Sequence, residues 1–201
     1  MKKIVLFSLA LIIMASFKMA KDEKATAYKV DAEKSNVAWL GEKVTGEHNG
    51  YIKLKEGALQ VENGKLKGGT FLIDMTSINC EDIKDEATNQ KLVGHLKSDD
   101  FFGVSAYPTS KLEIKKVTAK GGDQYEIMGH LTIRDKTNPV TFPATVAVDG
   151  ENVTAKAEIT VDRSDYNVKY GSGSFFDNLG DKMIYDDFTL NVNLVASNAS
   201  M

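Results

Sequence analysis

The chain has 201 residues, of which 42% are hydrophobic and 26% charged, and its formal net charge is −3. This balance excludes a disordered or collagen-like chain and suffices for one domain with a sizeable core. The slightly acidic charge gives no basic surface for nucleic acid, and the single cysteine, Cys80, excludes an internal disulfide.

The first twenty residues have the pattern of an export signal. Lys2 and Lys3 precede an uncharged run, 4–16, which is short for a bilayer span and has the length of a signal-peptide core. We predict a signal peptide over 1–20, cleaved between residues 20 and 27. The mature chain is then periplasmic or secreted, without a membrane span. An N-terminal membrane anchor is the alternative.

Strand patterns dominate the rest of the chain. Segments 36–44 and 51–75 carry β-branched and aromatic residues, and turn signals at Glu56-Gly57 and Asn63-Gly64 divide the second segment. Asn-Gly between alternating segments is the strongest short signal for a hairpin. Further turn signals follow at 120–123, 135–139 and 148–152. This spacing is typical of an antiparallel meander.

The segment 81–103 breaks the strand pattern. It has no period of two, and Ile83, Ala87, Leu92 and Leu96 fit a helical stripe with acidic residues near its start. We therefore predict a short helical excursion between two strands.

The later segments alternate, with one apolar face and one polar face each. Their apolar faces include the small residues Gly129, Ala144 and Ala157 beside large ones. Small inward residues favour an eight-stranded barrel with room for a ligand over a fully packed sandwich. Small residues matched to large neighbours in a packed core are the alternative, and periodicity alone does not decide between the two.

Five segments, taken in order, resemble the YceI-like family of lipocalin-like polyisoprenoid-binding proteins. They are "YKVDAEKSNVAWLGEKVTGEHNGYI" (28–52), "GGTFLIDMTSI" (68–78), "HLKSDDFFGVSAYP" (95–108), "GHLTIRDKTNPVTFP" (129–143) and "DRSDYNVKYG" (162–171). The resemblance implies an all-β, eight-stranded antiparallel lipocalin-like barrel over 28–196, which holds a long-chain isoprenoid or other lipid. It also implies that Phe101 and Phe102 cover one mouth of the barrel or line its entrance.

If the strands close into one barrel, their apolar faces line a single lumen. The predicted ligand-binding residues are Trp39, Phe71, Ile73, Ile114, Ile127, Leu131, Phe142, Val146, Ala157, Ile159, Phe188 and Leu190. We expect Trp39, the only tryptophan, to be buried. Binding would rest on apolar burial.

Catalytic and metal-binding patterns are weak. His48, His95 and His130 lie in separate segments without metal-ligand spacing, and "DRSD" (162–165) is typical of a salt-bridged turn. We expect no enzyme activity, no metal and no cofactor. The alternatives are a packed-barrel stress-response or interaction protein without ligand, and an enzyme using His95, Cys80 or a metal. The sequence does not distinguish a monomer from a homodimer.

Overall fold

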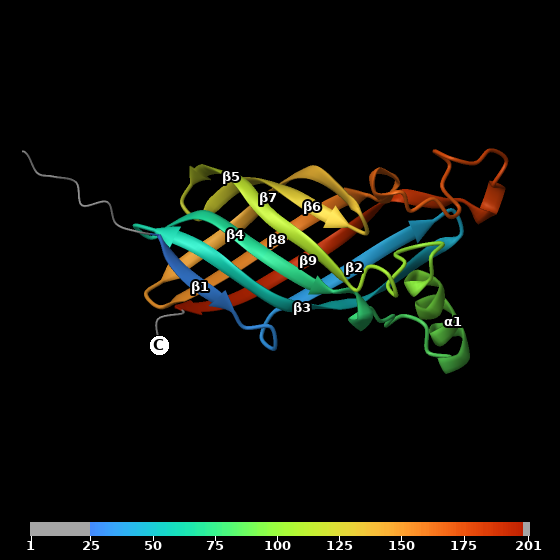
Figure 1. Ribbon diagram of the computed structural model, residues 1–201, viewed down its shortest axis with the longest axis horizontal. Coiled ribbons are helices and arrows are strands. Elements are labelled where there is room, and N and C mark those ends of the chain that lie inside the picture. Colours follow the sequence, from blue (N-terminus) through green and yellow to red (C-terminus); the bar gives the residue numbers. More distant parts are fainter. Residues whose placement is uncertain (1–24, 199–201) are drawn as a thin grey trace, which may run out of the picture.

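The computed structural model describes residues 25–198, which form one closed barrel of antiparallel strands (Figure 1). The strands are β1 (Thr26–Val30), β2 (Asn36–Lys43), β3 (Gly46–Glu62), β4 (Lys65–Asp74), β5 (Thr109–Gly121), β6 (Gln124–Ile133), β7 (Lys136–Asp149), β8 (Asn152–Asp162) and β9 (Ile184–Asn198). From β2 to β9 each strand pairs with the next, and β9 returns to pair with β2. The predicted eight-stranded antiparallel barrel is confirmed.

The ninth strand, β1, does not widen the barrel. It pairs with the second half of β3, through Ala58–Val61, and with the end of β9, through Ala196–Asn198. The first half of β3 and the first part of β9 pair with β2. Thus β1 and β2 share one of the eight positions around the barrel.

The expected turn at Glu56-Gly57 is wrong, because β3 runs through it as one strand of 17 residues. A β-bulge between Leu54 and Glu56 absorbs the irregularity. A Cβ at Gly57 would lie 2.8 Å from Phe71 Cδ1, so only a residue without a side chain lets the Phe71 ring pack this close to β3. The Asn63-Gly64 turn is confirmed, with both residues at positive φ, 52° and 70°.

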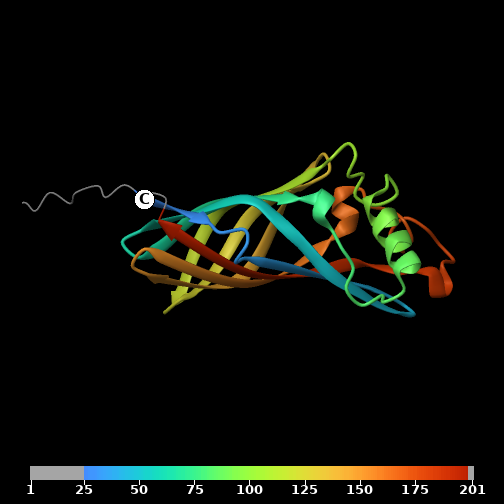
Figure 2. The same cartoon turned by 90° about the horizontal axis from the view of Figure 1, so that it is seen from below.

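The predicted helical excursion is also confirmed. The chain leaves β4 through the 3₁₀ turn η1 (Met75–Ser77), forms α1 (Glu86–Lys97) and returns to β5. The Asp85 side chain caps α1 by accepting a hydrogen bond from Thr88 N at 2.9 Å. Figures 1 and 2 show that α1 lies across one end of the barrel.

The segment 163–183 lies at the same end as α1 in both views (Figure 2). It contains η2 (Arg163–Tyr166) and η3 (Gly180–Lys182) and leads into β9. The opposite end of the barrel is closed by packed side chains and by a hydrogen bond from Tyr28 Oη to Gly150 O at 2.8 Å. The buried apolar residues there include Leu59, Val61, Leu66, Val153 and Ala196. The barrel therefore has a packed base and one end covered by helix and loops.

Strands β7 and β8 separate toward the helical end. Their pairing runs from the Asp149–Asn152 turn only as far as Ala144 and Ala157, whereas β7 pairs with β6 from Lys136 to Thr145. Pro139 and Pro143 lie in the part of β7 that pairs with β6 but not with β8. Proline has no N–H to give to a neighbouring strand, so these two residues suit a strand edge.

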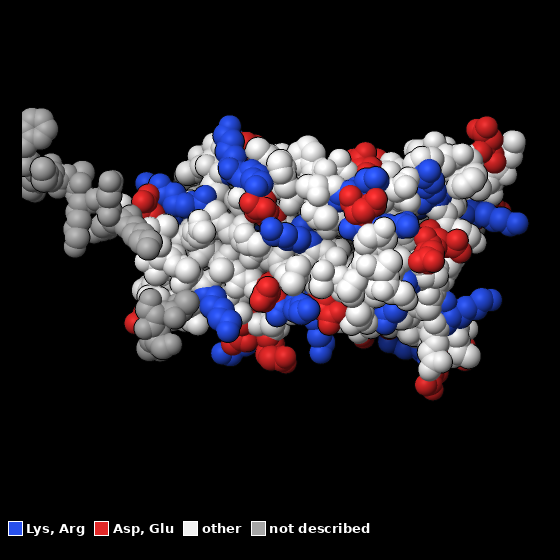
Figure 3. All heavy atoms as spheres, in the orientation of Figure 1, with Lys and Arg blue, Asp and Glu red and all other residues white. Residues whose placement is uncertain are grey.

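The surface agrees with the composition. On the face shown in Figure 3, basic and acidic side chains are interspersed along the barrel. Within residues 25–198, no helix combines the length and apolar character needed to cross a membrane. The predicted signal peptide lies outside the described residues.

Candidate functional site

Two cavities lie one after the other inside the barrel. The upper cavity, under α1, has about 1130 Å³ of empty space including the solvent at its mouth, and the lower cavity has about 780 Å³ by the same measure. Val37, Ile73, Leu131 and Leu190 line both cavities, so the two meet at the middle of the barrel. Together they form an elongated lumen with an almost wholly apolar wall.

The structure places all twelve predicted site residues on the wall of this lumen. Trp39 and Phe188 line the upper cavity, and Ile73, Leu131 and Leu190 line both. The remaining seven line the lower cavity: Phe71, Ile114, Ile127, Phe142, Val146, Ala157 and Ile159. Alternation along each strand therefore located the wall correctly, whereas contact of these residues with a ligand stays a prediction.

The sequence analysis missed several wall residues on β3 and β5. Ile52, Leu54 and Leu59 all face the lumen, although their spacing changes from even to odd along β3. Ile52 and Leu54 are in phase with each other, and the bulge after Leu54 shifts the alternation by one residue, which is why a fixed period of two does not extend to Leu59. On β5, Leu112 lies two residues before Ile114 and faces the lumen with it, so alternation from Ile114 would have located it.

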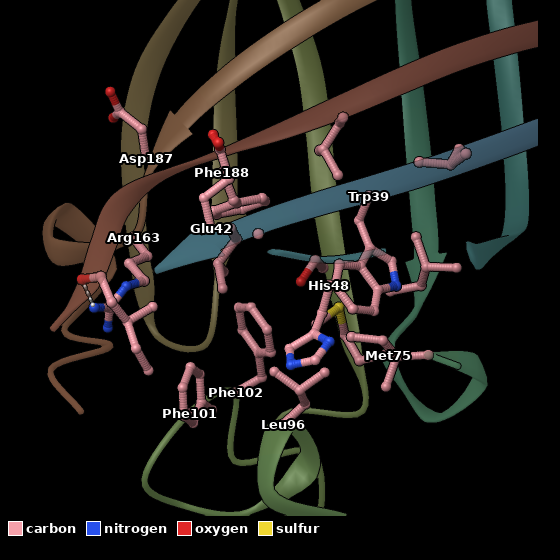
Figure 4. Close-up of a pocket in the computed structure, with 18 of the residues that line it drawn as sticks. Trp39, Glu42, His48, Met75, Leu96, Phe101, Phe102, Arg163, Asp187 and Phe188 are labelled. Carbon is pink, nitrogen blue, oxygen red and sulfur yellow. Dashed lines mark hydrogen bonds between the residues drawn. The ribbon is translucent and has the colours of Figure 1, made fainter. Parts of the chain in front are cut away.

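The upper cavity is roofed by apolar side chains from α1 and the turn after it. Leu92, Leu96, Phe101 and Phe102, which we call the lid residues, all line this cavity. Figure 4 shows Leu96, Phe101 and Phe102 rising from below toward β2 and β9. No residue of α1 is fully buried, so the helix covers a cavity and not a filled core.

Aromatic contacts attach the lid to the rest of the mouth. The ring centroid of His95 lies 4.9 Å from that of Phe101 and 4.4 Å from that of Tyr170, in edge-to-face geometry. The ring centroid of Phe102 lies 6.4 Å from that of Phe188 on β9. Phe101 is buried and Phe102 half-buried, so the pair both covers the mouth, as predicted, and lines the space beneath it.

Trp39 is half-buried, so the expectation that it is buried is wrong. Its indole lines the upper cavity, and its Nε1 donates a hydrogen bond to Asn79 O at 3.0 Å. The segment around Asn79 crosses the inner side of β3, because a Cβ at Gly50 would lie 2.1 Å from Asn79 O. Trp39 is therefore held in place by the loop after η1 while one face stays open to the cavity.

The small residues do not all supply room. A Cβ at Gly129 would lie 3.0 Å from Leu112 Cδ1, so Leu112 already fills that space and the expected contribution of Gly129 is wrong. Ala144 and Ala157 are paired neighbours on β7 and β8, and both line the lower cavity. Near the mouth, a Cβ at Gly41 would have no heavy atom closer than Trp39 Cζ3 at 4.0 Å, which makes Gly41 a further source of room.

Arg163 is a buried charge at the mouth, with 4% of its surface exposed. Its nitrogens donate to four backbone carbonyls at 2.8–3.1 Å, those of Val168, Tyr170, Ile184 and Tyr185. Its Nη2 also forms an ion pair with Asp186 at 3.2 Å. Burial lowers the pKa of Arg163, while Asp186 and Asp162 oppose that effect. The predicted salt-bridged turn is thus a tie between η2 and β9.

A polar cluster adjoins the upper cavity on β3. His48 lines the cavity, and its Nδ1 lies 2.8 Å from Asp82 Oδ2. Asp82 Oδ1 accepts hydrogen bonds from Asn49 N at 2.9 Å and from Cys80 Sγ at 3.2 Å. Burial opposes ionisation of Asp82, but these three hydrogen bonds together lower its pKa to about 2. Asp82 is therefore a carboxylate at neutral pH.

We expect Asp82→Asn to lower the thermal stability of the protein at neutral pH but not in strong acid. The pKa of Asp82 is about 2 in the folded state, below the ordinary value of 3.8. The carboxylate therefore contributes its full stabilisation at pH values above 3.8. This contribution is lost as the pH falls through about 2. Thermal midpoints of wild type and variant, measured from pH 6 to 2, should begin to approach each other below about pH 4 and differ least at pH 2. Asp149→Asn, at an exposed carboxylate near the base, is the control, and a gap that stays constant down to pH 2 would contradict the assignment.

The cluster does not have the arrangement of a cysteine nucleophile. Cys80 Sγ donates to a carboxylate, and burial raises the pKa of the thiol. His95, considered as its partner from the sequence, lies against Phe101 and Tyr170. In the part of the chain that the structure describes, no three His, Cys, Asp or Glu side chains form a group that could hold a metal ion. His130 is exposed on the outer face of β6, as expected from alternation.

Comparison with known proteins confirms the resemblance seen in the sequence. A family model described as the YceI-like domain matches residues 28–196. A UPF0312 protein of Pseudomonas putida is 26% identical over 172 residues, which cover 80% of this chain and 85% of the relative. A UPF0312 protein of Shewanella denitrificans is 28% identical over 152 residues, which cover 72% and 74%.

Two solved structures share the fold. The crystal structure of Burkholderia cenocepacia BcnA superposes with a TM-score of 0.62 at 26% identity, covering 84% of this chain and 99% of that one. A polyisoprenoid-binding domain from Saccharophagus degradans, implicated in plant cell wall breakdown, also gives a TM-score of 0.62, at 11% identity, over 86% and 99% of the two chains. At 11% identity the likeness concerns the fold alone.

Proposed function

Because this chain belongs to the YceI-like family, we propose that it is an exported protein that holds a long apolar lipid chain, of the polyisoprenoid type, inside its barrel. The observation that carries the proposal is the elongated apolar lumen, closed at the base and roofed by the lid residues. The Saccharophagus domain of the same fold, which is named for polyisoprenoid binding, supports the choice of ligand class.

The shape of the lumen suits a chain and not a compact ligand. The upper and lower cavities follow one another along the barrel and share four wall residues. For a methyl-branched chain lying along them, burial of each CH₂ would contribute about 0.8 kcal/mol of favourable binding free energy, before the cost of ordering the chain is subtracted. Affinity is therefore expected to increase with the number of isoprene units until the lumen is full.

The proposed function is binding, in which the apolar wall contacts the ligand. Such a wall offers no acid, base or nucleophile to most of a bound chain. Apart from Lys156 on the lower cavity, the charged side chains that line the lumen lie on the upper cavity, where a headgroup would sit. The chain of the ligand would point to the packed base.

Native mass spectrometry of the protein purified from its own source tests the proposal. We expect a mass above that of the mature chain by one lipid, and fragmentation should release a molecule with isoprenoid mass spacing. Protein of bare mass that also fails to take up added polyprenols of several lengths would contradict the function.

Export is a separate expectation of the proposal and has its own test. We expect the N-terminal residue of the mature protein to lie between 21 and 28, after removal of the segment that begins with Lys2-Lys3. Sequencing the protein from cell fractions measures both the cleavage site and the compartment. Recovery of mature protein that still begins with Met1 would contradict cleavage.

A further inference from the structure

His48 is the polar group best placed to meet a headgroup at the mouth. It lies on β3 directly opposite Gly41 of β2, and both residues line the upper cavity. Because Gly41 has no side chain, the space next to the imidazole stays open. Figure 4 shows the ring directed into the cavity, toward the lid residues. The ring can therefore touch a ligand that enters under the lid.

The hydrogen bond to Asp82 determines which ring nitrogen carries the proton. Asp82 is ionised, since its pKa is about 2, and a carboxylate only accepts hydrogen bonds. His48 Nδ1, at 2.8 Å, must therefore be the donor. In the neutral imidazole the other nitrogen, Nε2, then carries a lone pair and accepts hydrogen bonds. Among the described residues, Nε2 has no hydrogen-bond partner of its own.

The mouth is poorly equipped for an anionic headgroup. Arg163 lines the upper cavity, but each of its three guanidinium nitrogens is already engaged by backbone carbonyls or by Asp186. The other charged side chains on this cavity are Glu42, Lys43 and Asp187, two acidic and one basic. With Asp82 behind His48, the local charge is negative, which opposes a phosphate.

We propose that His48 is a specificity-determining residue, whose Nε2 accepts a hydrogen bond from an uncharged hydroxyl headgroup on the bound chain. This inference rests on the proposed function and deepens it: the preferred ligand is an isoprenoid alcohol, rather than an isoprenoid phosphate or a chain without a hydrogen-bond donor. Asp82 is a positioning residue, because it acts by fixing the tautomer and orientation of His48.

Three ligands with the same chain test this inference on delipidated protein. Geranylgeraniol carries the hydroxyl donor, its methyl ether has the oxygen without the proton, and geranylgeranyl phosphate has the charge. Quenching of Trp39, the only tryptophan and a wall residue of the same cavity, reports the dissociation constants. We expect the wild type to bind the alcohol about three- to ten-fold more tightly than the ether, the range of one net hydrogen bond. The phosphate should bind no more tightly than the alcohol.

Substitutions then assign the preference to His48. His48→Leu should bind alcohol and ether equally, whereas His48→Gln, which keeps an acceptor oxygen, should retain part of the preference. Asp82→Asn should also reduce it, because an amide no longer enforces one tautomer. His130→Leu makes the same change on the outer face of β6 and should behave as the wild type. Thermal midpoints measured in parallel identify any variant that is poorly folded.

The outcomes separate this inference from the proposed function. Equal binding of alcohol and ether by the wild type, or a preference that survives His48→Leu, would overturn the role of His48 while leaving a lipid-binding barrel. Tighter binding of the phosphate would overturn the uncharged headgroup. Failure of all three ligands to bind would overturn the proposed function as well.

Discussion

Arg163→Leu is expected to lower the free energy of unfolding by about 3–5 kcal/mol, the cost of removing one partner from a buried charged network. The variant leaves Asp186 without its cation and four backbone carbonyls without their donor. Those carbonyls belong to the segment after η2 and to the start of β9, which the guanidinium ties together. For a domain of this size the thermal midpoint should fall by roughly 10 °C.

Two further substitutions sharpen this test. Arg163→Lys keeps a positive charge near Asp186 but offers one nitrogen in place of a planar fork, so it should recover only part of the loss. Lys169→Leu removes an exposed cation from the same segment, where it lies 4.8 Å from the Phe175 ring, and should change the midpoint little. Urea unfolding measures all three. A loss below about 1 kcal/mol for Arg163→Leu would show that the network is unimportant for stability.

Ala157→Phe is expected to abolish most lipid retention while leaving the barrel folded. Ala157 lines the lower cavity and pairs with Ala144, so a phenyl ring there would occupy the space of the ligand chain. Displacing two or three carbons of the chain would cost about 2 kcal/mol of burial, or roughly a thirty-fold loss of affinity. Native mass spectrometry and a thermal scan of the same sample measure both properties.

The stability result distinguishes a ligand cavity from a packed core. In a packed core the same substitution would cost about 1–3 kcal/mol by overpacking, and the midpoint would fall by several degrees. Ala147→Phe, on the outer face of β7 opposite Thr154, adds the same ring outside the lumen and should retain the lipid. A variant at 157 that keeps its lipid but loses several degrees would reject the cavity.

Local pattern sufficed for much of the architecture. Inward and outward positions on β6 to β9 follow from alternation, because the side-chain period of a strand is two whatever its neighbours are. Asn63-Gly64 predicted its hairpin for an equally local reason, since both residues tolerate positive φ. The excursion containing α1 could be recognised because the period of two stops there.

Local pattern failed where the partner strand decides the backbone. Glu56-Gly57 has the composition of a turn, yet Gly57 is needed because Phe71 of the neighbouring strand packs against it. The bulge beside it shifts the register, and this hid Leu59 from a fixed period. Gly129 appeared to supply room, but Leu112 from β5 fills that space.

Residue patterns by themselves therefore determined the inward strand faces and the helical excursion, whereas the eight-stranded barrel came from the resemblance to the YceI-like family. Only the tertiary structure decided which polar side chains meet at the mouth. His48 and Asp82 are 34 residues apart, and Arg163 and Asp186 are 23 apart, so no spacing along the chain relates either pair. Closure of the barrel brings β3 against the loop after η1, and η2 against β9. The protonation and hydrogen bonding of these side chains depend on that closure, because they are determined by burial and by neighbouring groups rather than by residue type alone.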